Sequence, residues 1–328
     1  QEPNNKNLIL EKFQAGEISI KKAFKLLTDK GNSKELIHNK FEDRKKTNNK
    51  SNKRSVKTNS IQALKELDQL VGLEKVKSLI QEYIAFLKVQ KLRKKYGLKN
   101  KDVVMHMIFK GNPGTGKTTV ARIIGKIFNE IGYLENGKML EAERADLVGE
   151  YIGHTAKKTK EMVEKAMGGV LFIDEAYALA RGGKRDFGKE SIDTLVKAME
   201  DNRDDLIIIL AGYRNEMEYF LQQNPGLRSR FSIHLDFPDY SIEQLIKIAE
   251  LMYHEREYIL TANSKHYLDN VLTKIRNNEG SNKGNARTVR NVVERSIRHQ
   301  AQRIMNQDSI SVNKLKKIKV KDLARGRP

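Results

Sequence analysis

The chain has 328 residues, enough for two or three domains with hydrophobic cores, and a formal net charge of +20. It contains no cysteine, which excludes disulfides and thiolate metal sites, and no apolar run approaches transmembrane length. The positive charge would suit nucleic acid or another anionic surface. No helix-turn-helix, zinc-finger or aromatic RNA-binding motif accompanies it, so a Lys- and Asn-rich surface is the preferred interpretation.

Residues 1–42 are predicted to form a small helical hairpin. Two apolar stripes lie between residues 8 and 30, where Gly16 separates them and Ser19 can cap the second helix. Because so small a unit buries little surface, we expect it to need a partner. Residues 43–60 are polar and basic with almost nothing apolar, which is typical of a linker.

An α/β domain is predicted over residues 61–238. Its first forty residues have helical periodicity, and strands then alternate with helices. The predicted strands are the apolar runs at 103–109, 170–174, 206–212 and 232–237. This alternation predicts a parallel sheet with helices on both faces. From residue 239 to 328 only helical periodicity is found, so an all-helical domain is expected to follow.

The stretch GNPGTGKTT, residues 111–119, lies between the first predicted strand and a helix. It fits G-x-x-x-x-G-K-[ST], a loop whose backbone N–H groups surround phosphates. Lys117 is expected to reach the β- and γ-phosphates, and the Thr118 hydroxyl to bind Mg²⁺. The predicted nucleotide-binding residues of this loop are Gly111, Asn112, Pro113, Gly114, Thr115, Gly116, Lys117, Thr118 and Thr119. No N-K-x-D motif follows, so ATP is preferred to GTP.

A second motif, VLFIDE, spans residues 170–175 and ends a buried strand with two acids. Asp174, at the carboxyl end of the strand, is expected to hold Mg²⁺. Glu175 is expected to activate the water that attacks the γ-phosphate.

Three further stretches carry weaker signals. Tyr151 precedes Ile152 and Gly153 in a polar surrounding, and it could either pack under its own loop or act as an exposed contact. Two arginines lie two residues apart in NPGLRSRF, residues 224–231, which alone would suggest surface residues. Arg287 is predicted to lie in the first turn of a helix, where the dipole disfavours a cation that has no anionic partner.

Together these stretches resemble the AAA+ ATPases, and within them the CbxX/CfqX group, which includes the red-type Rubisco activases. The resemblance extends from about residue 67 to about residue 301 and is strongest to the group's sporulation members. It implies a P-loop NTPase core followed by a small all-helical lid, and a Mg²⁺-dependent ATPase. It also implies a homo-oligomer, most simply a hexameric ring, that remodels or threads a polypeptide substrate, with sporulation the expected process. Because a nucleotide-dependent enzyme needs the cytosol, where ATP is, a cytoplasmic location is expected, and the lack of nucleic-acid motifs makes nucleic acid an unlikely partner.

The resemblance also assigns roles to individual residues. Arg287 matches the lid arginine that contacts the nucleotide of its own subunit. Arg230, with Arg228 as the alternative, would act on the ATP of the next subunit. Tyr151, followed by Ile152, would contact polypeptide in the central pore.

By the same resemblance, the adenine would lie near Val71 and Gly72. One position departs from the commoner pattern, in which the fourth strand ends in an asparagine that positions the attacking water. Here the strand is followed by Tyr213, and Asn215 lies just beyond, so either could take this role. Two other functions stay open: a nucleic-acid-linked loader that uses the basic N-terminal region, and a nucleotide-gated scaffold.

Overall fold

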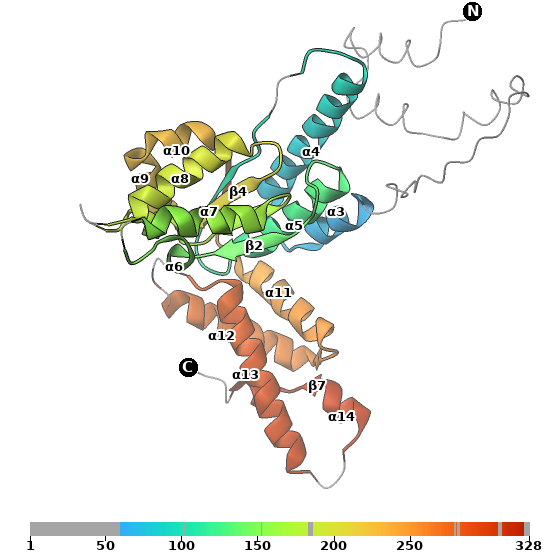
Figure 1. Ribbon diagram of the computed structural model, residues 1–328. Coiled ribbons are helices and arrows are strands. Elements are labelled where there is room, and N and C mark those ends of the chain that lie inside the picture. Colours follow the sequence, from blue (N-terminus) through green and yellow to red (C-terminus); the bar gives the residue numbers. More distant parts are fainter. Residues whose placement is uncertain are drawn as a thin grey trace, which may run out of the picture. The chain divides into compact units, whose positions relative to one another are not determined.

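The computed structural model describes residues 60–100, 103–151, 153–182, 186–278, 280, 283–307 and 310–324 (Figure 1). The predicted N-terminal hairpin, and the linker up to residue 59, lie outside these described residues. No helix of the described part is long and apolar enough to cross a membrane.

A five-stranded parallel sheet forms the centre of the α/β part, in the order β2-β3-β4-β1-β5. Its strands are β1 (Met107–Gly111), β2 (Met139–Ala142), β3 (Val170–Ile173), β4 (Ile207–Gly212) and β5 (Ile233–Phe237). The predicted parallel sheet is therefore confirmed. Because the strands are parallel, the carboxyl ends of β1, β3 and β4 meet at one edge, where Lys110 pairs with Gly212 and Ile173 with Leu210.

Two strand predictions differ from the structure. Strand β2 was not predicted, because its MLEA sequence is mostly half-buried at the sheet edge and carries little apolar signal. Strand β1 begins at Met107 rather than at residue 103. His106 lies immediately before β1. Its Nδ1 accepts a hydrogen bond from the backbone N–H of Ile208 at 3.0 Å, so this N–H of β4 is paired with a side chain.

Helices cover both faces of the sheet (Figure 1). One buried core joins a sheet face to α3 (Ser60–Gln69), α4 (Glu74–Lys95) and α5 (Lys117–Glu130). The other core joins the opposite face to a second set of helices. These are α6 (Arg144–Leu147), α7 (His154–Ala166), η2 (Ala176–Ala180), α8 (Gly188–Asp201), α9 (Arg214–Gln223) and α10 (Pro225–Arg230). Alternate residues divide between the cores: Phe109 belongs to the first and Ile108 to the second.

A helical domain follows β5, as predicted. Its helices are α11 (Ile242–Glu255), α12 (Ala262–Asn278), α13 (Ala286–Met305), α14 (Val312–Lys316) and α15 (Val320–Ala324). Ser241 begins it with a capping box to Gln244. The domain also holds a short parallel pair, β6 (Ile259–Leu260) with β7 (Lys317–Ile318), that the helical pattern did not predict. Strands of two residues are too short to show an alternating pattern.

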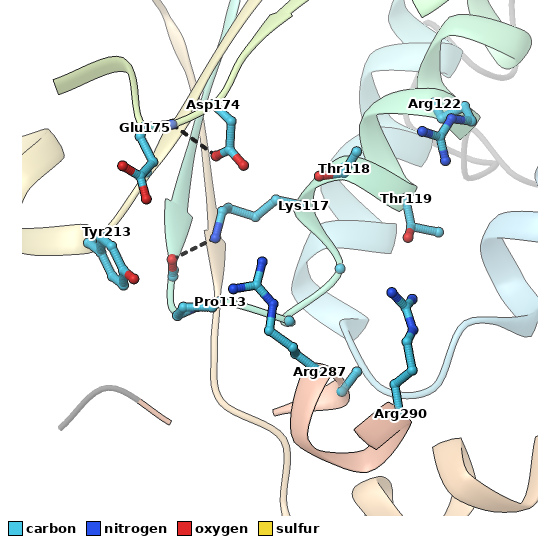
Figure 2. Close-up of a pocket in the computed structure, with 15 residues that line it drawn as sticks. Pro113, Lys117, Thr118, Thr119, Arg122, Asp174, Glu175, Tyr213, Arg287 and Arg290 are labelled. Carbon is cyan, nitrogen blue, oxygen red and sulfur yellow. Dashed lines mark hydrogen bonds between the residues drawn. The ribbon is translucent and has the colours of Figure 1, made fainter. Parts of the chain in front are cut away.

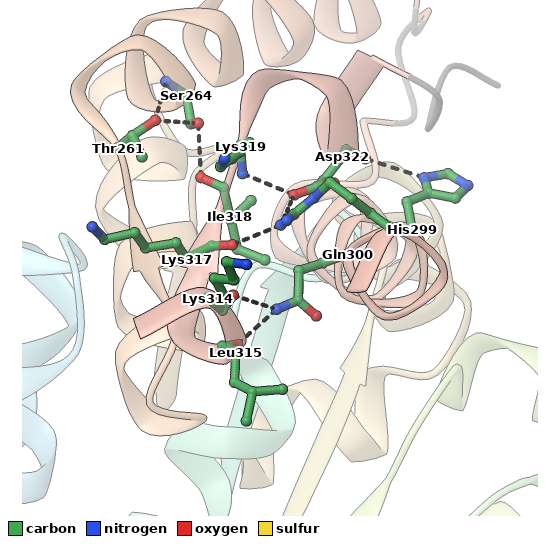
Figure 3. Close-up of polar contacts among 11 residues, drawn as sticks. Thr261, Ser264, His299, Gln300, Lys314, Leu315, Lys317, Ile318, Lys319 and Asp322 are labelled. Carbon is green, nitrogen blue, oxygen red and sulfur yellow. Dashed lines mark hydrogen bonds and ion pairs between the residues drawn. The ribbon is translucent and has the colours of Figure 1, made fainter. Parts of the chain in front are cut away.

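A buried ion pair holds the end of this domain together (Figure 3). Arg303 on α13 donates from Nε to Asp322 Oδ1 at 2.7 Å and from Nη2 to Oδ2 at 2.8 Å, and both side chains are buried. The Lys319 backbone N–H also donates to Asp322 Oδ2, and Arg303 Nη2 donates to the Lys317 carbonyl. These contacts fix β7 and α15 against α13.

Candidate functional site

The loop predicted to bind phosphate joins the end of β1 to the start of α5. Gly116 caps the helix with φ of 98° and Gly114 has φ of 70°, so both adopt a left-handed conformation that favours glycine. A Cβ on Gly114 would lie 2.4 Å from the carbonyl oxygen of Gly284, which precedes α13. The loop therefore needs glycine both for its own bend and for the close approach of the helical domain.

Lys117 begins α5 and arches back over the loop. Its Nζ donates to the carbonyl oxygens of Gly111 at 2.7 Å and Asn112 at 2.9 Å. The pKa of Lys117 is lowered, chiefly because burial disfavours its charged form. The Asp174 and Glu175 carboxylates oppose this shift, and Arg287 adds to it. The lysine thus lies within the electrostatic field of both predicted catalytic carboxylates and of an arginine from the helical domain.

These groups face one cavity of about 370 Å³ between the loop, the ends of β3 and β4, and the start of α13 (Figure 2). Its lining residues are Gly111, Pro113, Gly114, Gly116, Lys117, Thr118, Thr119, Arg122, Asp174, Glu175, Gly212, Tyr213, Ala286, Arg287 and Arg290. Four of the side chains are cationic and two are carboxylates. The net positive charge suits a polyphosphate.

The two acids directly follow the last residue of β3. The Glu175 backbone N–H donates to Asp174 Oδ1 at 2.9 Å. Glu175 itself has φ of 46°, a left-handed conformation that costs a non-glycine residue about 1–3 kcal/mol. This backbone turns the Glu175 side chain toward the cavity, where Figure 2 shows it beside Asp174 and opposite Lys117.

The donor set of the cavity fits Mg²⁺ bound together with a nucleotide. The Thr118 hydroxyl and the Asp174 carboxylate line the same space. Mg²⁺ is commonly held by one or two protein oxygens plus phosphate and water. Among the described residues there is no cluster of three or more His, Cys, Asp or Glu that could hold a metal by itself, so this pair is the candidate metal site.

Not every residue of the predicted loop faces the cavity. Asn112 donates from Nδ2 to Asp239 Oδ1 at 2.9 Å. Thr115 is buried and donates from its hydroxyl to the Asn112 carbonyl at 2.7 Å. These two side chains maintain the loop's shape and connect it to the chain that leaves the sheet.

Sequence reasoning missed a polar network that joins the loop to the helical domain. Asn285 is buried, accepts the Tyr240 backbone N–H at 3.0 Å and donates to Asp239 Oδ1 at 2.8 Å and to the Pro113 carbonyl at 3.3 Å. The Tyr240 hydroxyl donates to the Thr115 carbonyl at 3.0 Å, and burial raises the pKa of Tyr240 to about 12. The local sequence signal at this point is Gly284, a residue that lets the chain turn but does not reveal which distant residues it approaches.

Of the two candidates for positioning water, Tyr213 lines the cavity and Asn215 does not. Tyr213 directly follows β4 and caps α9, and its ring centroid is 6.0 Å from that of Tyr177. Asn215 lies in the first turn of α9 and is exposed. Val71 and Gly72 also lie outside the lining, although Leu73 comes within 3.5 Å of the position that a Cβ on Gly116 would occupy.

The arginines divide into two groups. Arg287 lies in the first turn of α13 and lines the cavity, accompanied by Arg290 and Arg122, which the sequence did not single out. Arg228 and Arg230 lie on α10 and do not line it. Arg230 donates from Nη1 to the Gly226 carbonyl at 2.9 Å and forms an ion pair with Glu200.

Tyr151 is 65% exposed, which excludes packing under its own loop. Its ring and that of His154 lie in an edge-to-face arrangement, with their centroids 5.5 Å apart, and Gly153 caps α7 with φ of 79°. The side chain borders a separate hollow of about 320 Å³, and none of the residues that line it also lines the nucleotide-binding cavity. Ile152 lies outside the described residues.

The fold and cavity define a nucleotide-binding protein with a phosphate-binding loop and a helical lid. Residues 107–239 match the family described as "ATPase family associated with various cellular activities (AAA)", and residues 241–327 match the AAA lid domain. The chain belongs to the AAA ATPase family, in the group of stage V sporulation protein K, CbbX and CfxQ, and it is an ATPase.

Two relatives illustrate the similarity. Stage V sporulation protein K of Bacillus subtilis is 54% identical over 261 residues, covering 79% of this chain and 81% of that protein. CbbX of Cereibacter sphaeroides is 47% identical over 250 residues, covering 76% and 80%. The structure of the FIGL-1 AAA domain in complex with ADP has a TM-score of 0.54 at 17% identity, covering 79% of this chain and 82% of that one, which is a likeness of fold.

Proposed function

We propose that this chain uses the energy of ATP hydrolysis to remodel a polypeptide substrate. The observation that carries the proposal is a separation within the α/β domain. Lys117, Asp174 and Glu175 face one cavity, together with Arg287 of the lid. The exposed Tyr151 lies on a different surface, near the start of α7. Such a separation allows hydrolysis at one site to move a contact at another.

Each group in the cavity has a chemical role in this proposal. The loop's backbone N–H groups and Lys117 bind the phosphates, while Thr118 and Asp174 hold Mg²⁺, which neutralises phosphate charge when bound. Glu175 accepts a proton from the water that attacks the γ-phosphate, and the Tyr213 hydroxyl orients that water. The adenine is assigned to the Val71–Gly72 segment because the adjoining Leu73 approaches Gly116.

Coupling to motion follows from where the cavity lies. Arg287 reaches it from the lid, and the Asn285–Asp239 network joins the lid to the loop. Loss of the γ-phosphate would remove an anionic contact of Arg287 and change the preferred position of the lid. The lid therefore acts as the element that responds to the state of the nucleotide.

Assembly into a homo-oligomeric ring, most simply a hexamer, completes the proposed site. Arg230 does not line the cavity of its own chain, so it can stabilise a γ-phosphate only in a neighbouring copy. Arg228, on the same short helix, is the alternative. We assign the protein to the cytoplasm, where ATP is available, and to sporulation on the basis of its similarity to stage V sporulation protein K.

The experiment is site-specific photo-crosslinking in a chain that binds ATP but hydrolyses it slowly. A photoreactive phenylalanine analogue replaces Tyr151 in full-length protein carrying Glu175→Gln, and crosslinks are mapped with and without ATP. The matched control places the analogue at Tyr219, which is 66% exposed, against 65% for Tyr151, but lies on α9. We expect ATP-dependent crosslinks to polypeptide from position 151 alone.

Three outcomes would contradict the proposal. Equal crosslinking from positions 151 and 219 would remove the special role of Tyr151. ATPase activity that DNA or RNA stimulates, with a steep dependence on salt, would instead favour the nucleic-acid-linked function. Slow ATP turnover that no candidate substrate changes, with assembly set by nucleotide, would favour the scaffold.

A further inference from the structure

Arg290 faces the cavity one helical turn after Arg287, and the predicted nucleotide contacts did not include it. The first turn of α13 is fixed against the phosphate-binding loop, because the Ala286 backbone N–H donates to the Gly114 carbonyl at 3.1 Å. Residues three apart lie on the same side of a helix. Both arginines therefore extend from α13 toward the loop, as Figure 2 shows.

Among the described residues, no protein anion lies beside Arg290. In the part of the chain that the structure describes, no carboxylate lies within 4.0 Å of its guanidinium, whereas Arg303 on the same helix is paired with Asp322 and Arg122 with Glu141. An anionic ligand in the cavity would supply the counter-charge that these protein groups do not.

The two arginines occupy different ends of the cavity. Arg287 perturbs the pKa of Lys117 and also lines a second hollow together with Asp174 and Glu175. Arg290 is not among the groups that shift the pKa of Lys117, and it does not line that second hollow. In Figure 2 its guanidinium lies on the Thr119 side of the loop, away from the two carboxylates. Since Lys117 and Asp174 mark the end that takes the β- and γ-phosphates, Arg290 marks the opposite end.

We propose that Arg290 binds the α-phosphate and ribose end of the nucleotide, while Arg287 serves the γ-phosphate end. The inference rests on the proposed nucleotide site and assigns the two lid arginines separate tasks. Arg290 then holds ATP and ADP alike, so the lid keeps a contact with the nucleotide after hydrolysis. Arg287 supplies the contact that depends on the γ-phosphate.

The test compares binding of ADP with that of AMP-PNP, an ATP analogue that is not hydrolysed, by titration calorimetry with Mg²⁺. Full-length wild type, Arg290→Ala, Arg290→Gln and Arg287→Ala are measured. The control is Arg298→Ala, which removes an exposed cation further along α13. Loss of a charged hydrogen bond corresponds to about tenfold or more in affinity. We expect both Arg290 variants to weaken ADP and AMP-PNP equally, and Arg287→Ala to weaken AMP-PNP more than ADP.

The result that would overturn this assignment is specific to Arg290. Unchanged binding in both Arg290 variants, or weaker binding of AMP-PNP alone, would show that Arg290 does not hold the α-phosphate end. Failure of the nucleotide site itself would look different, because the wild type and Arg298→Ala would then bind neither ligand.

Discussion

At the scale of single residues, Glu175 combines a strained backbone with a position beside Asp174. Its left-handed φ of 46° is unfavourable for glutamate, and the following η2 helix and the Asp174 side chain hold it in place. Gln has nearly the same shape but cannot accept the proton. With Glu175 as the proposed general base, a substitution to Gln should separate binding from catalysis at this position.

We expect Glu175→Gln to bind Mg·ATP with near wild-type affinity and to hydrolyse it at least about a hundredfold more slowly, because general base catalysis contributes that much or more. Binding is measured by calorimetry and turnover by phosphate release. The control is Glu161→Gln on α7, which is exposed outside the nucleotide-binding cavity and should change neither quantity. Wild-type turnover in Glu175→Gln would exclude Glu175 as the base.

His106 gives the protein a predictable dependence on pH. Burial lowers its pKa from 6.5 to about 4, and the backbone of Met199 opposes this in part. The unfolded chain therefore binds a proton that the folded chain excludes, between about pH 6.5 and pH 4. This contribution to stability is complete above pH 6.5 and is lost as the pH falls through about 4, a loss of about 3 kcal/mol.

The variant His106→Asn should remove this part of the pH dependence. Asn can still accept the Ile208 N–H but does not titrate. Urea unfolding at pH 7 and pH 4.5 measures the free energy of unfolding, and its pH dependence should be smaller in the variant than in wild type. His266→Asn, at an exposed position on α12, should keep the wild-type dependence. Equal pH dependence in wild type and His106→Asn would contradict the burial argument.

At the scale of elements, the contact between the phosphate-binding loop and α13 decides whether sheet domain and lid can share one nucleotide. Gly114 and Gly97 form a natural comparison, since both are left-handed, with φ of 70° and 69°. A Cβ on Gly114 would meet the Gly284 carbonyl oxygen and, at 2.7 Å, the backbone nitrogen of Arg287. A Cβ on Gly97 would meet nothing within 4 Å.

We expect Gly97→Ala to cost only the backbone strain, about 1–2 kcal/mol, with nucleotide affinity unchanged. Gly114→Ala should cost that strain and also push α13 away from the loop, with affinity for Mg·ATP falling by at least about tenfold. Thermal unfolding and calorimetry measure the two effects. Equal affinities in the two variants would show that close contact with the lid is unnecessary for binding.

At the scale of the whole molecule, the position of Arg230 outside its own cavity predicts that activity requires more than one copy. An arginine supplied in trans contributes about 10³–10⁵ to phosphoryl transfer in other P-loop enzymes. Within one chain Arg230 is held by Glu200 on α8 and by the Gly226 carbonyl. In the proposed function, assembly brings it to a neighbour's nucleotide.

Mixing two inactive variants tests this arrangement. Arg230→Ala keeps its own nucleotide site, and Lys117→Ala loses its site but keeps Arg230, so each alone should be nearly inactive. We expect a mixture to recover part of the wild-type phosphate release, because the Lys117→Ala copies supply arginine to the Arg230→Ala copies. A mixture as inactive as its components would indicate that Arg230 acts within its own chain, and wild-type activity in Arg230→Ala alone would show that it has no role. Arg228→Ala, measured in the same way, distinguishes the two candidate arginines.

The sequence by itself determined those features that depend on neighbours along the chain. The glycines and Lys117 of the loop, the buried strand before Asp174 and the place of Arg287 in a first helical turn are all local patterns, and the structure brings these residues to one cavity. Strand β2 was not predicted because it has only four residues, three of them partly or fully exposed, which carry too little periodicity.

Only the tertiary structure decided which distant residues meet. Asn112 contacts Asp239 across 127 positions of sequence, and Asn285 reaches Pro113 across 172. The choice of Tyr213 over Asn215 as a cavity residue, and the presence of Arg290, likewise follow from how α9 and α13 pack. A hydrogen bond between such residues leaves no periodic trace in either segment. It forms because folding excludes water from the contact, so each buried polar group must find its partner in another part of the chain.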